Sequence, residues 1–310
     1  MKLKKLLILV LVFAIQNRLC SQDLESIELS EEWLAKITDL APARPSVTTD
    51  GSKKILIFSL YTGYDHWVIP HTEAVLKLLL SCSGAARFST SKDISEFEAD
   101  KIDQYDAIVL NNTCPEREDR DIFLDVLRKD DSMTEPERME KAAALEANLI
   151  RFVAEGGGLM LVHGGATMQN NSEDFSFMTG GSFDFHPKQQ PIQVELADPS
   201  HPLVRGFNGQ GFVHTDEPYF YKNAYIDKNF RPLLYMKASE LEGLEQQFEE
   251  DIRYIAWIKR FGEGRIFLLS PSHNAQSFEI PGLLQFYLDG MQYVLGDLEC
   301  DDTPVGNGKN

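Results

Sequence analysis

Short apolar runs separated by helical patterns restrict the fold of this chain more than any other feature. Three of the runs, Lys53–Leu60, Asp106–Asn112 and Leu159–Val162, are almost continuously apolar, as expected for strands buried on both faces. Ala86–Thr90 fits a fourth strand, and Val68–Leu80 has the periodicity of a helix. Strands that alternate with helices predict an α/β protein with a mainly parallel sheet covered by helices on both faces.

The longest predicted helix is marked at both of its ends. Thr134 and Glu137 form a capping-box pattern, and Pro136 lies in the first turn. We expect this helix to continue to about Glu155 and to stop at the glycine that follows. The densely charged residues 116–134 before it predict an excursion on the surface.

The pattern changes in the second half of the chain, after Gly181. Four segments there alternate apolar and polar residues, which predicts an antiparallel extension of the sheet and one returning strand, Arg265–Ser270. A closing helix is expected over Gly282–Leu295. Residues 299–310 are polar and predict a frayed tail.

The N-terminus has the pattern of a secretory signal peptide, residues 1–21. Three lysines precede Leu6–Ile15, an apolar run too short to span a bilayer comfortably. We therefore expect cleavage after Ser21, export to the periplasm or the medium, and no stable membrane insertion afterwards. Lipidation of Cys20 is the less favoured alternative, because Leu19 before it is not small. Residues 22–50 predict a linker or an N-terminal arm.

Charge and cysteine content exclude several classes of function. Removal of the signal, with three lysines and Arg18, would take the formal charge from −18 to −22. Such a protein is repelled by nucleic acid and by anionic membranes, so a small neutral or cationic partner is expected. Cys82, Cys114 and Cys300 remain, and an odd number argues against a disulfide framework while leaving room for one bridge. Composition says nothing about the oligomeric state.

Histidines follow several of the predicted strands. His66, His163 and His273 lie just beyond strand ends, and Asn112 ends the third strand. Because ligands bind at the carboxyl ends of the strands in such sheets, we expect these side chains at one edge. His163 stands in a glycine-flanked turn of the kind that presents a nucleophile in several α/β enzymes.

The other histidines have either a functional or a structural interpretation. His186 and His214 lie in irregular glycine-rich segments, and Asp216 and Glu217 follow His214. Histidines gathered at one site serve either proton transfer or metal binding. His71 favours helix packing and His201 favours a turn.

Common catalytic and nucleotide-binding motifs are missing from the sequence. No serine occupies the glycine-rich turn, and neither a P-loop nor a GxGxxG pattern after the first strand is present. We therefore expect no nucleotide cofactor.

Six segments resemble the ThuA-like (trehalose utilisation) family of the class I glutamine amidotransferase-like superfamily, in the order that the family has them. They are GYDHW (63–67), EGGGLMLVHGGA (155–166), GGSFDFHP (180–187), ADPSHPLVRGF (197–207), HTDEPYF (214–220) and AWIKRFGEGRIFLLSPSH (256–273). The resemblance implies a flavodoxin-like three-layer sandwich and a ThuA-like domain over residues 51–298.

The resemblance also bears on the chemistry. Glutamine amidotransferases hold a nucleophilic cysteine where this chain has His163, whereas the late histidine, His273, is kept. Cys114 is on another loop, so glutaminase activity is not expected. Ser272 stands where the family more often has glycine before the last histidine.

The resemblance and the histidines together predict an exported enzyme that acts on a sugar or keto-sugar in carbohydrate metabolism. The catalytic candidates are His163, His273 and Glu217. The candidate ligands of a divalent metal ion, zinc or similar, are His163, His186, His214 and His273. The candidates for binding the carbohydrate are His66, Trp67, Tyr64, Asn112 and Tyr219. The alternative is a non-catalytic carbohydrate-binding or sensory domain on the same scaffold.

Overall fold

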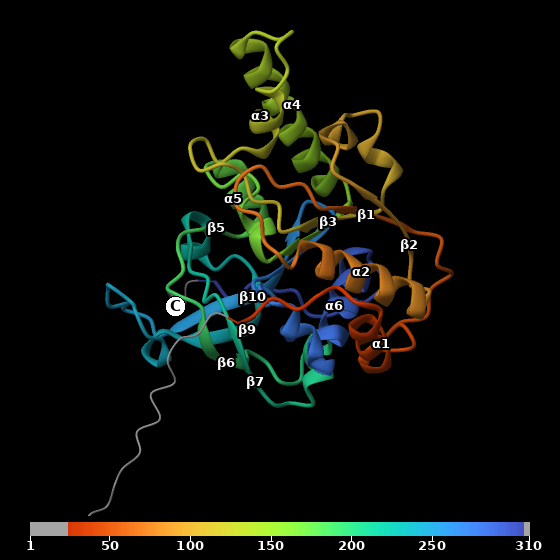
Figure 1. The fold of residues 1–310 in the computed structure, drawn as a ribbon, viewed down its shortest axis with the longest axis vertical. Coiled ribbons are helices and arrows are strands. Elements are labelled where there is room, and N and C mark those ends of the chain that lie inside the picture. Colours follow the sequence, from red (N-terminus) through yellow and green to blue (C-terminus); the bar gives the residue numbers. More distant parts are fainter. Residues whose placement is uncertain (1–23, 307–310) are drawn as a thin grey trace, which may run out of the picture.

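The predicted parallel strands form one half of a nine-stranded sheet in the computed structural model, which describes residues 24–306 (Figure 1). The strand order of the whole sheet is β2-β1-β3-β4-β11-β10-β9-β6-β7, and its first five strands are parallel. These five are β2 (Arg87–Ser91), β1 (Lys54–Phe58), β3 (Ala107–Asn111), β4 (Gly158–Val162) and β11 (Gly264–Leu269).

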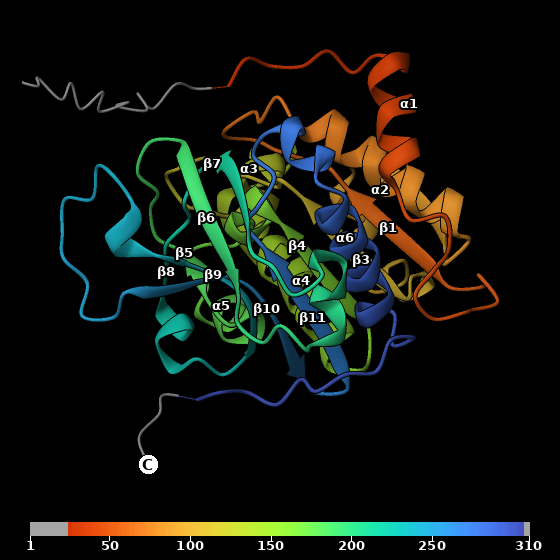
Figure 2. The same cartoon turned by 90° about the horizontal axis from the view of Figure 1, so that it is seen from below.

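The other half of the sheet is antiparallel, as the alternating segments predicted. Its strands are β10 (Ile252–Phe261), β9 (Arg231–Lys237), β6 (Gln190–Leu196) and β7 (Phe212–Asp216). Figure 2 shows β6 and β7 well away from β1, on the other side of the molecule. A separate antiparallel pair consists of β5 (Ser182–Phe183) and β8 (Tyr221–Lys222).

Six α-helices within residues 24–306 cover the two faces of the sheet. Ile55 and Ile57 of β1 face one apolar core and Leu56 and Phe58 face the other, because side chains alternate along a strand. The first core is shared with α1 (Glu31–Leu40), α2 (Ile69–Ser83) and α6 (Pro281–Val294), and the second with α3 (Ile122–Leu127), α4 (Glu135–Ala154) and α5 (Glu173–Thr179). The predicted three-layer α/β architecture is confirmed.

The local signals in the sequence determine the ends of the helices. The capping box of α4 is formed by Thr134 and Glu137, as predicted. The α2 helix ends at Gly84, whose φ of +67° is a left-handed conformation that glycine adopts without steric cost.

Four segments differ from the prediction. The expected N-terminal arm contains α1, whose Trp33 and Ile37 are buried. The charged excursion contains α3, which is anchored by Phe123. Residues 212–216, expected to be irregular, form β7. The C-terminal segment, expected to be frayed, is attached to the fold as far as it is described, because the backbone N–H of Val305 donates to the carbonyl of Phe230. In each case buried apolar side chains or backbone hydrogen bonds hold the segment against the rest of the fold.

Three expectations concern the ends and the cysteines of the chain. The signal peptide over residues 1–21, with Cys20, lies outside the described residues. Between residues 24 and 306, no helix combines the length and the apolarity that crossing a membrane requires. Cys82, Cys114 and Cys300 are all free thiols.

Candidate functional site

The register of the central strands brings the predicted residues to one edge of the sheet. Asn111 of β3 pairs with Val162 of β4, and Val162 pairs in turn with Leu269 of β11. His163 therefore follows β4 beside the residues that end the two neighbouring strands. Its ring Nδ1 lies 2.6 Å from the carbonyl oxygen of Ser270.

The turn at His163 requires both of the glycines after it. The φ of His163 is +46°, a left-handed value that residues other than glycine adopt rarely. A Cβ atom on Gly164 would lie 2.5 Å from Sγ of Cys114 and 3.0 Å from Cε1 of His66, and one on Gly165 would lie 2.3 Å from the carbonyl of Leu110. The sharp, side-chain-free turn expected from the sequence is therefore present, with histidine at its tip.

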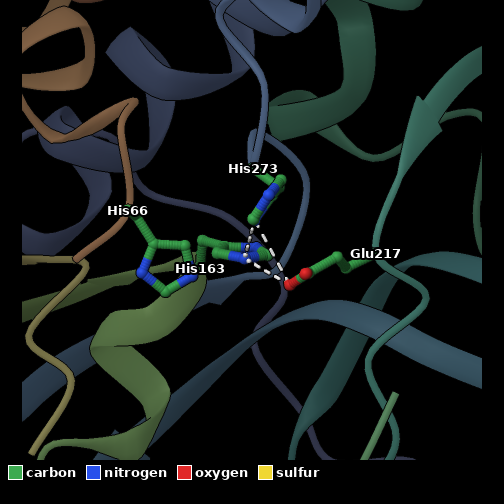
Figure 3. A group of neighbouring side chains, drawn as sticks. All are labelled: His66, His163, Glu217 and His273. Atoms are coloured by element: carbon green, nitrogen blue, oxygen red, sulfur yellow. Dashed lines mark hydrogen bonds and ion pairs between the residues drawn. The ribbon is translucent and has the colours of Figure 1, made fainter. Parts of the chain in front are cut away.

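Four side chains from different parts of the chain meet in front of this turn. Nε2 of His163, Nδ1 of His273 and Oε2 of Glu217 form a triangle with sides of 3.2, 3.3 and 3.2 Å. His66 completes the group, in which one possible ligand atom of each residue lies within 4.8 Å of the others. Figure 3 shows the triangle in dashed lines, with His66 beside it.

The hydrogen bonds around the group show which atoms carry lone pairs. The Ser270 carbonyl can only accept, so Nδ1 of His163 carries a proton, and a neutral His163 ring would turn the lone pair of Nε2 toward His273 and Glu217. Since Glu217 is ionised, a neutral His163 would leave two acceptors 3.3 Å apart. A proton could bridge one pair of atoms in the triangle at a time, whereas a metal ion would satisfy all three.

The dimensions of the triangle fit a tetrahedral metal site. Zinc–nitrogen and zinc–oxygen bonds of about 2.0–2.1 Å place neighbouring ligand atoms about 3.3 Å apart in tetrahedral coordination. The three measured separations are 3.2, 3.3 and 3.2 Å. Three histidines and one carboxylate are also ligand types that zinc prefers.

Asp216 organises the loops that carry the triangle. Its carboxylate accepts hydrogen bonds from the backbone N–H groups of Ser272 (2.7 Å), His273 (3.1 Å) and Glu217 (2.8 Å). It therefore joins the end of β7 to the loop after β11. Asp216 is a site residue that the sequence prediction misses, although its position between His214 and Glu217 is the signal for it.

Burial and mutual charge set the protonation of the group. Burial, followed by the neighbouring charges of His163 and His273, lowers the pKa of His66 well below its ordinary value, which keeps this ring neutral. Burial raises the pKa of Glu217, but hydrogen bonds to His163 and His273 outweigh it, so the pKa is lowered and the carboxylate is ionised.

Cys114 is close to the site but is not activated. Its Sγ lies 3.7 Å from Nδ1 of His66, and burial raises the pKa of the thiol to about 12. A thiol with this pKa is protonated at neutral pH and is therefore a poor nucleophile.

A cavity of about 330 Å³ opens onto the group. Tyr219 is buried in its wall, with its ring centroid 4.3 Å from that of His163, and the exposed Tyr64 lies 4.6 Å from His66. The complete lining is Tyr64, His66, Cys114, Pro115, Arg117, Arg120, Thr167, Phe183, His186, Glu217 and Tyr219. Sequence reasoning had singled out Tyr64, His66, His186, Glu217 and Tyr219 from this set.

The structure separates the predicted metal ligands into two groups. His163 and His273 are joined by Glu217 and His66, which had been assigned other roles. His186 is at the rim, with Nε2 3.7 Å from Oε2 of Glu217. His214 lies outside the group, since its Nδ1 faces Oγ of Ser277 (3.1 Å) and Asp216 (3.3 Å).

Two of the predicted carbohydrate-binding residues, Asn112 and Trp67, have structural roles outside the cavity. Asn112 is fully buried, and its side-chain oxygen accepts a hydrogen bond from Gly164, which stabilises the His163 turn. Trp67 packs against the ring of His71 and lines a different hollow. His71 and His201 have the structural roles expected of them. His71 is buried, and the side chain of His201 accepts a hydrogen bond from the backbone N–H of Leu203 at the start of the short helix Pro202–Phe207.

Comparison with known proteins identifies relatives of this fold. Residues 54–294 match the model of the ThuA family, described as trehalose utilisation. The structure is similar to a ThuA-like protein from Bacteroides uniformis, with 19% identity, a TM-score of 0.59 and coverage of 81% of this chain and 94% of that chain. A ThuA-like protein from Parabacteroides merdae has 18% identity, a TM-score of 0.53 and coverage of 79% and 90%, respectively. No curated protein matches the chain. At these identities the solved structures support the fold alone.

Proposed function

Because the chain belongs to the ThuA family of trehalose utilisation, we propose that it is an enzyme of carbohydrate utilisation that acts on a sugar or keto-sugar. The observation that carries the proposal is the convergence of His66, His163, Glu217 and His273, of which His66 and Glu217 line a cavity. Three lone-pair-bearing groups turned toward one point, beside an aromatic wall, suit a polar ligand with many oxygen atoms.

We propose that these four side chains hold a divalent metal ion of the zinc type. When bound, such an ion would polarise a carbonyl or hydroxyl oxygen of the sugar as a Lewis acid. Nδ1 of His163 is committed to Ser270, which orients the ring and leaves Nε2 for the ion. The low pKa of His66 keeps that ring in the neutral form that a ligand needs.

His186 is placed to move a proton, and we assign it the role of general base. Its Nδ1 lies 2.9 Å from the carbonyl of Pro187, so its proton belongs on Nδ1 and its Nε2 has a free lone pair. The side chain is 34% exposed and lines the cavity, so a proton taken from a ligand can pass on to solvent. A keto-sugar has an acidic C–H next to its carbonyl that a neutral histidine can remove.

Metal analysis combined with assays tests this function. We expect the purified protein to retain about one equivalent of metal and to convert a native or oxidised disaccharide, and chelation to abolish the conversion. His163→Ala and His273→Ala should lose both metal and activity. His186→Gln should keep the metal while the rate falls by roughly 10²- to 10⁴-fold.

The outcome of the same experiment decides between the enzyme and a non-catalytic domain. Sugar binding by calorimetry that survives His163→Ala, without any product, would establish the carbohydrate-binding alternative. A metal-free protein that converts none of these sugars would contradict the enzymatic proposal.

We further propose that residues 1–21 direct export. Sequencing the N-terminus of the mature protein from the producing cells would test this proposal.

A further inference from the structure

Two arginines in the wall of the cavity have no acidic partner in the part of the chain that the structure describes. Arg117 and Arg120 line the cavity beside His66 and Glu217. Among residues 24–306, neither guanidinium has an ion pair or a side-chain hydrogen bond, although the chain has 48 acidic residues and 30 basic ones. Seven other arginines do pair with carboxylates: Arg128, Arg138, Arg151, Arg205, Arg231, Arg260 and Arg265.

From this pair of arginines we infer that the ligand of the site is an anionic sugar, one that carries a carboxylate or phosphate group. A guanidinium presents two parallel N–H donors that match the two oxygens of such a group. A neutral sugar such as trehalose would leave both cations without a partner. The inference rests on the sugar site proposed above and adds the charge of its ligand.

The loop that carries the two arginines is held against the site. Arg120 has a φ of +57°, which L side chains adopt rarely, and its carbonyl accepts a hydrogen bond of 3.0 Å from the backbone of Asn170. At the start of the loop, the carbonyl of Cys114 accepts hydrogen bonds from Thr62 and Gly63. An anchored loop positions a recognition group with little loss of entropy on binding.

The electrostatics of the cavity favour an anion against the charge of the whole chain. Glu217 is the single carboxylate in the lining, and its charge is directed at the proposed metal ion. Two arginines against one carboxylate give the lining a net positive charge, which a bound divalent ion would increase. In a chain of formal charge −18, this is a local reversal of sign that attracts an anionic ligand.

Calorimetry on the zinc-loaded full chain tests the inference with glucose, glucuronate and glucose 6-phosphate. We expect at least one of the two anionic sugars to bind ten or more times tighter than glucose, and the tighter of them identifies the group. Arg117→Gln and Arg120→Gln should each weaken that binding by roughly ten- to a hundredfold, with glucose affinity and zinc content unchanged. Arg120→Lys should recover part of the loss, since it keeps the charge without the planar fork.

Arg44→Gln supplies the matched control, because Arg44 is exposed, has no ion pair among the described residues and does not line the cavity. This variant should bind both anionic sugars like the wild type. If glucose binds and is converted as well as the anionic sugars, this inference fails and the proposed function stands. If no sugar binds to zinc-loaded protein, both fail.

Discussion

Two residues of the site hold backbone conformations that favour glycine. The φ of His163 is +46° and that of Ser272, just before His273, is +101°. The strain at His163 places an imidazole at the tip of the turn. Ser272 is held because its N–H donates to Asp216 and its hydroxyl contacts the hydroxyl of Tyr287. The related family more often has glycine at this position, and the positive φ supplies the physical reason.

Ser272→Gly and Ser272→Ala should therefore reverse the usual order of stability. Both substitutions remove the hydroxyl, but glycine also removes the conformational strain. We expect the glycine variant to be about 1 kcal/mol more stable than the alanine variant, whereas glycine at an ordinary position is the less stable. Urea unfolding of the two variants measures the difference, and an alanine variant that is equally or more stable would contradict the strain argument.

Lys259 of β10 gives a prediction about pH. It is buried, it has no ion pair among the described residues, and burial lowers its pKa to about 8. Below pH 8 the lysine is charged in both the folded and the unfolded protein, so the whole free-energy cost of burying its charge opposes folding. Between pH 8 and about 10.4 the unfolded chain alone holds the proton, so the stability contributed by this group rises with pH.

Lys259→Met should consequently be more stable than the wild type at pH 7, by about 1–3 kcal/mol. This advantage should shrink as the pH rises from 8 to 10.5. Unfolding of the two proteins in parallel at pH 7, 9 and 10.5 isolates the effect from other groups. A constant difference across this range would show that charge burial is not its cause.

At the scale of elements, α1 shows how a few apolar residues convert a polar segment into part of the core. The segment around it is polar, yet Ser30 caps the helix, and Trp33 and Ile37, one turn apart, face the molecule. The ring of Trp33 packs edge-on against those of His71 (5.0 Å) and Phe278 (6.5 Å). A loosely docked arm would leave these contacts unmade.

Trp33→Ala should destabilise the whole protein by about 3–5 kcal/mol, because it empties a buried site between α2 and the segment before α6. Thr38→Ala, on the exposed face of the same helix, should change stability by no more than about 0.5 kcal/mol. Thermal or urea unfolding measures both. Equal, small effects would mean that α1 does not share the core in solution.

At the scale of the whole molecule, the site joins the two halves of the sheet. His163 and His273 follow the parallel strands β4 and β11, whereas Glu217 follows β7, which is four strands from β11 in the sheet order. In a flat sheet that separation would be about 19 Å, yet Asp216 of β7 contacts the backbone of Ser272 at 2.7 Å. The antiparallel half must therefore fold back over the carboxyl edge of the parallel half.

Metal binding should stabilise this arrangement as a unit. Zinc at a hundred times its dissociation constant should stabilise the fold by about 2.7 kcal/mol and raise the melting temperature by about 4–5 °C. A chelator should reverse the rise, and lower pH should diminish it because the histidines must be neutral to bind. Differential scanning fluorimetry measures the shift, which Glu217→Gln should largely remove. A full shift in that variant would place the metal elsewhere.

The sequence by itself determined the parallel half of the sheet and the place of His66, His163 and His273 at one edge of it. These features follow from short-range information: apolar runs, helix caps, glycines at turns, and the rule that parallel strands end together. Only the tertiary structure decided that Glu217 completes the group while His214 does not, that Asn112 supports the turn from inside, and that Arg117 and Arg120 line the cavity. Such contacts depend on how far the antiparallel half of the sheet folds back over the parallel half. Many weak packing interactions between distant residues set that position, and no local sequence pattern encodes them.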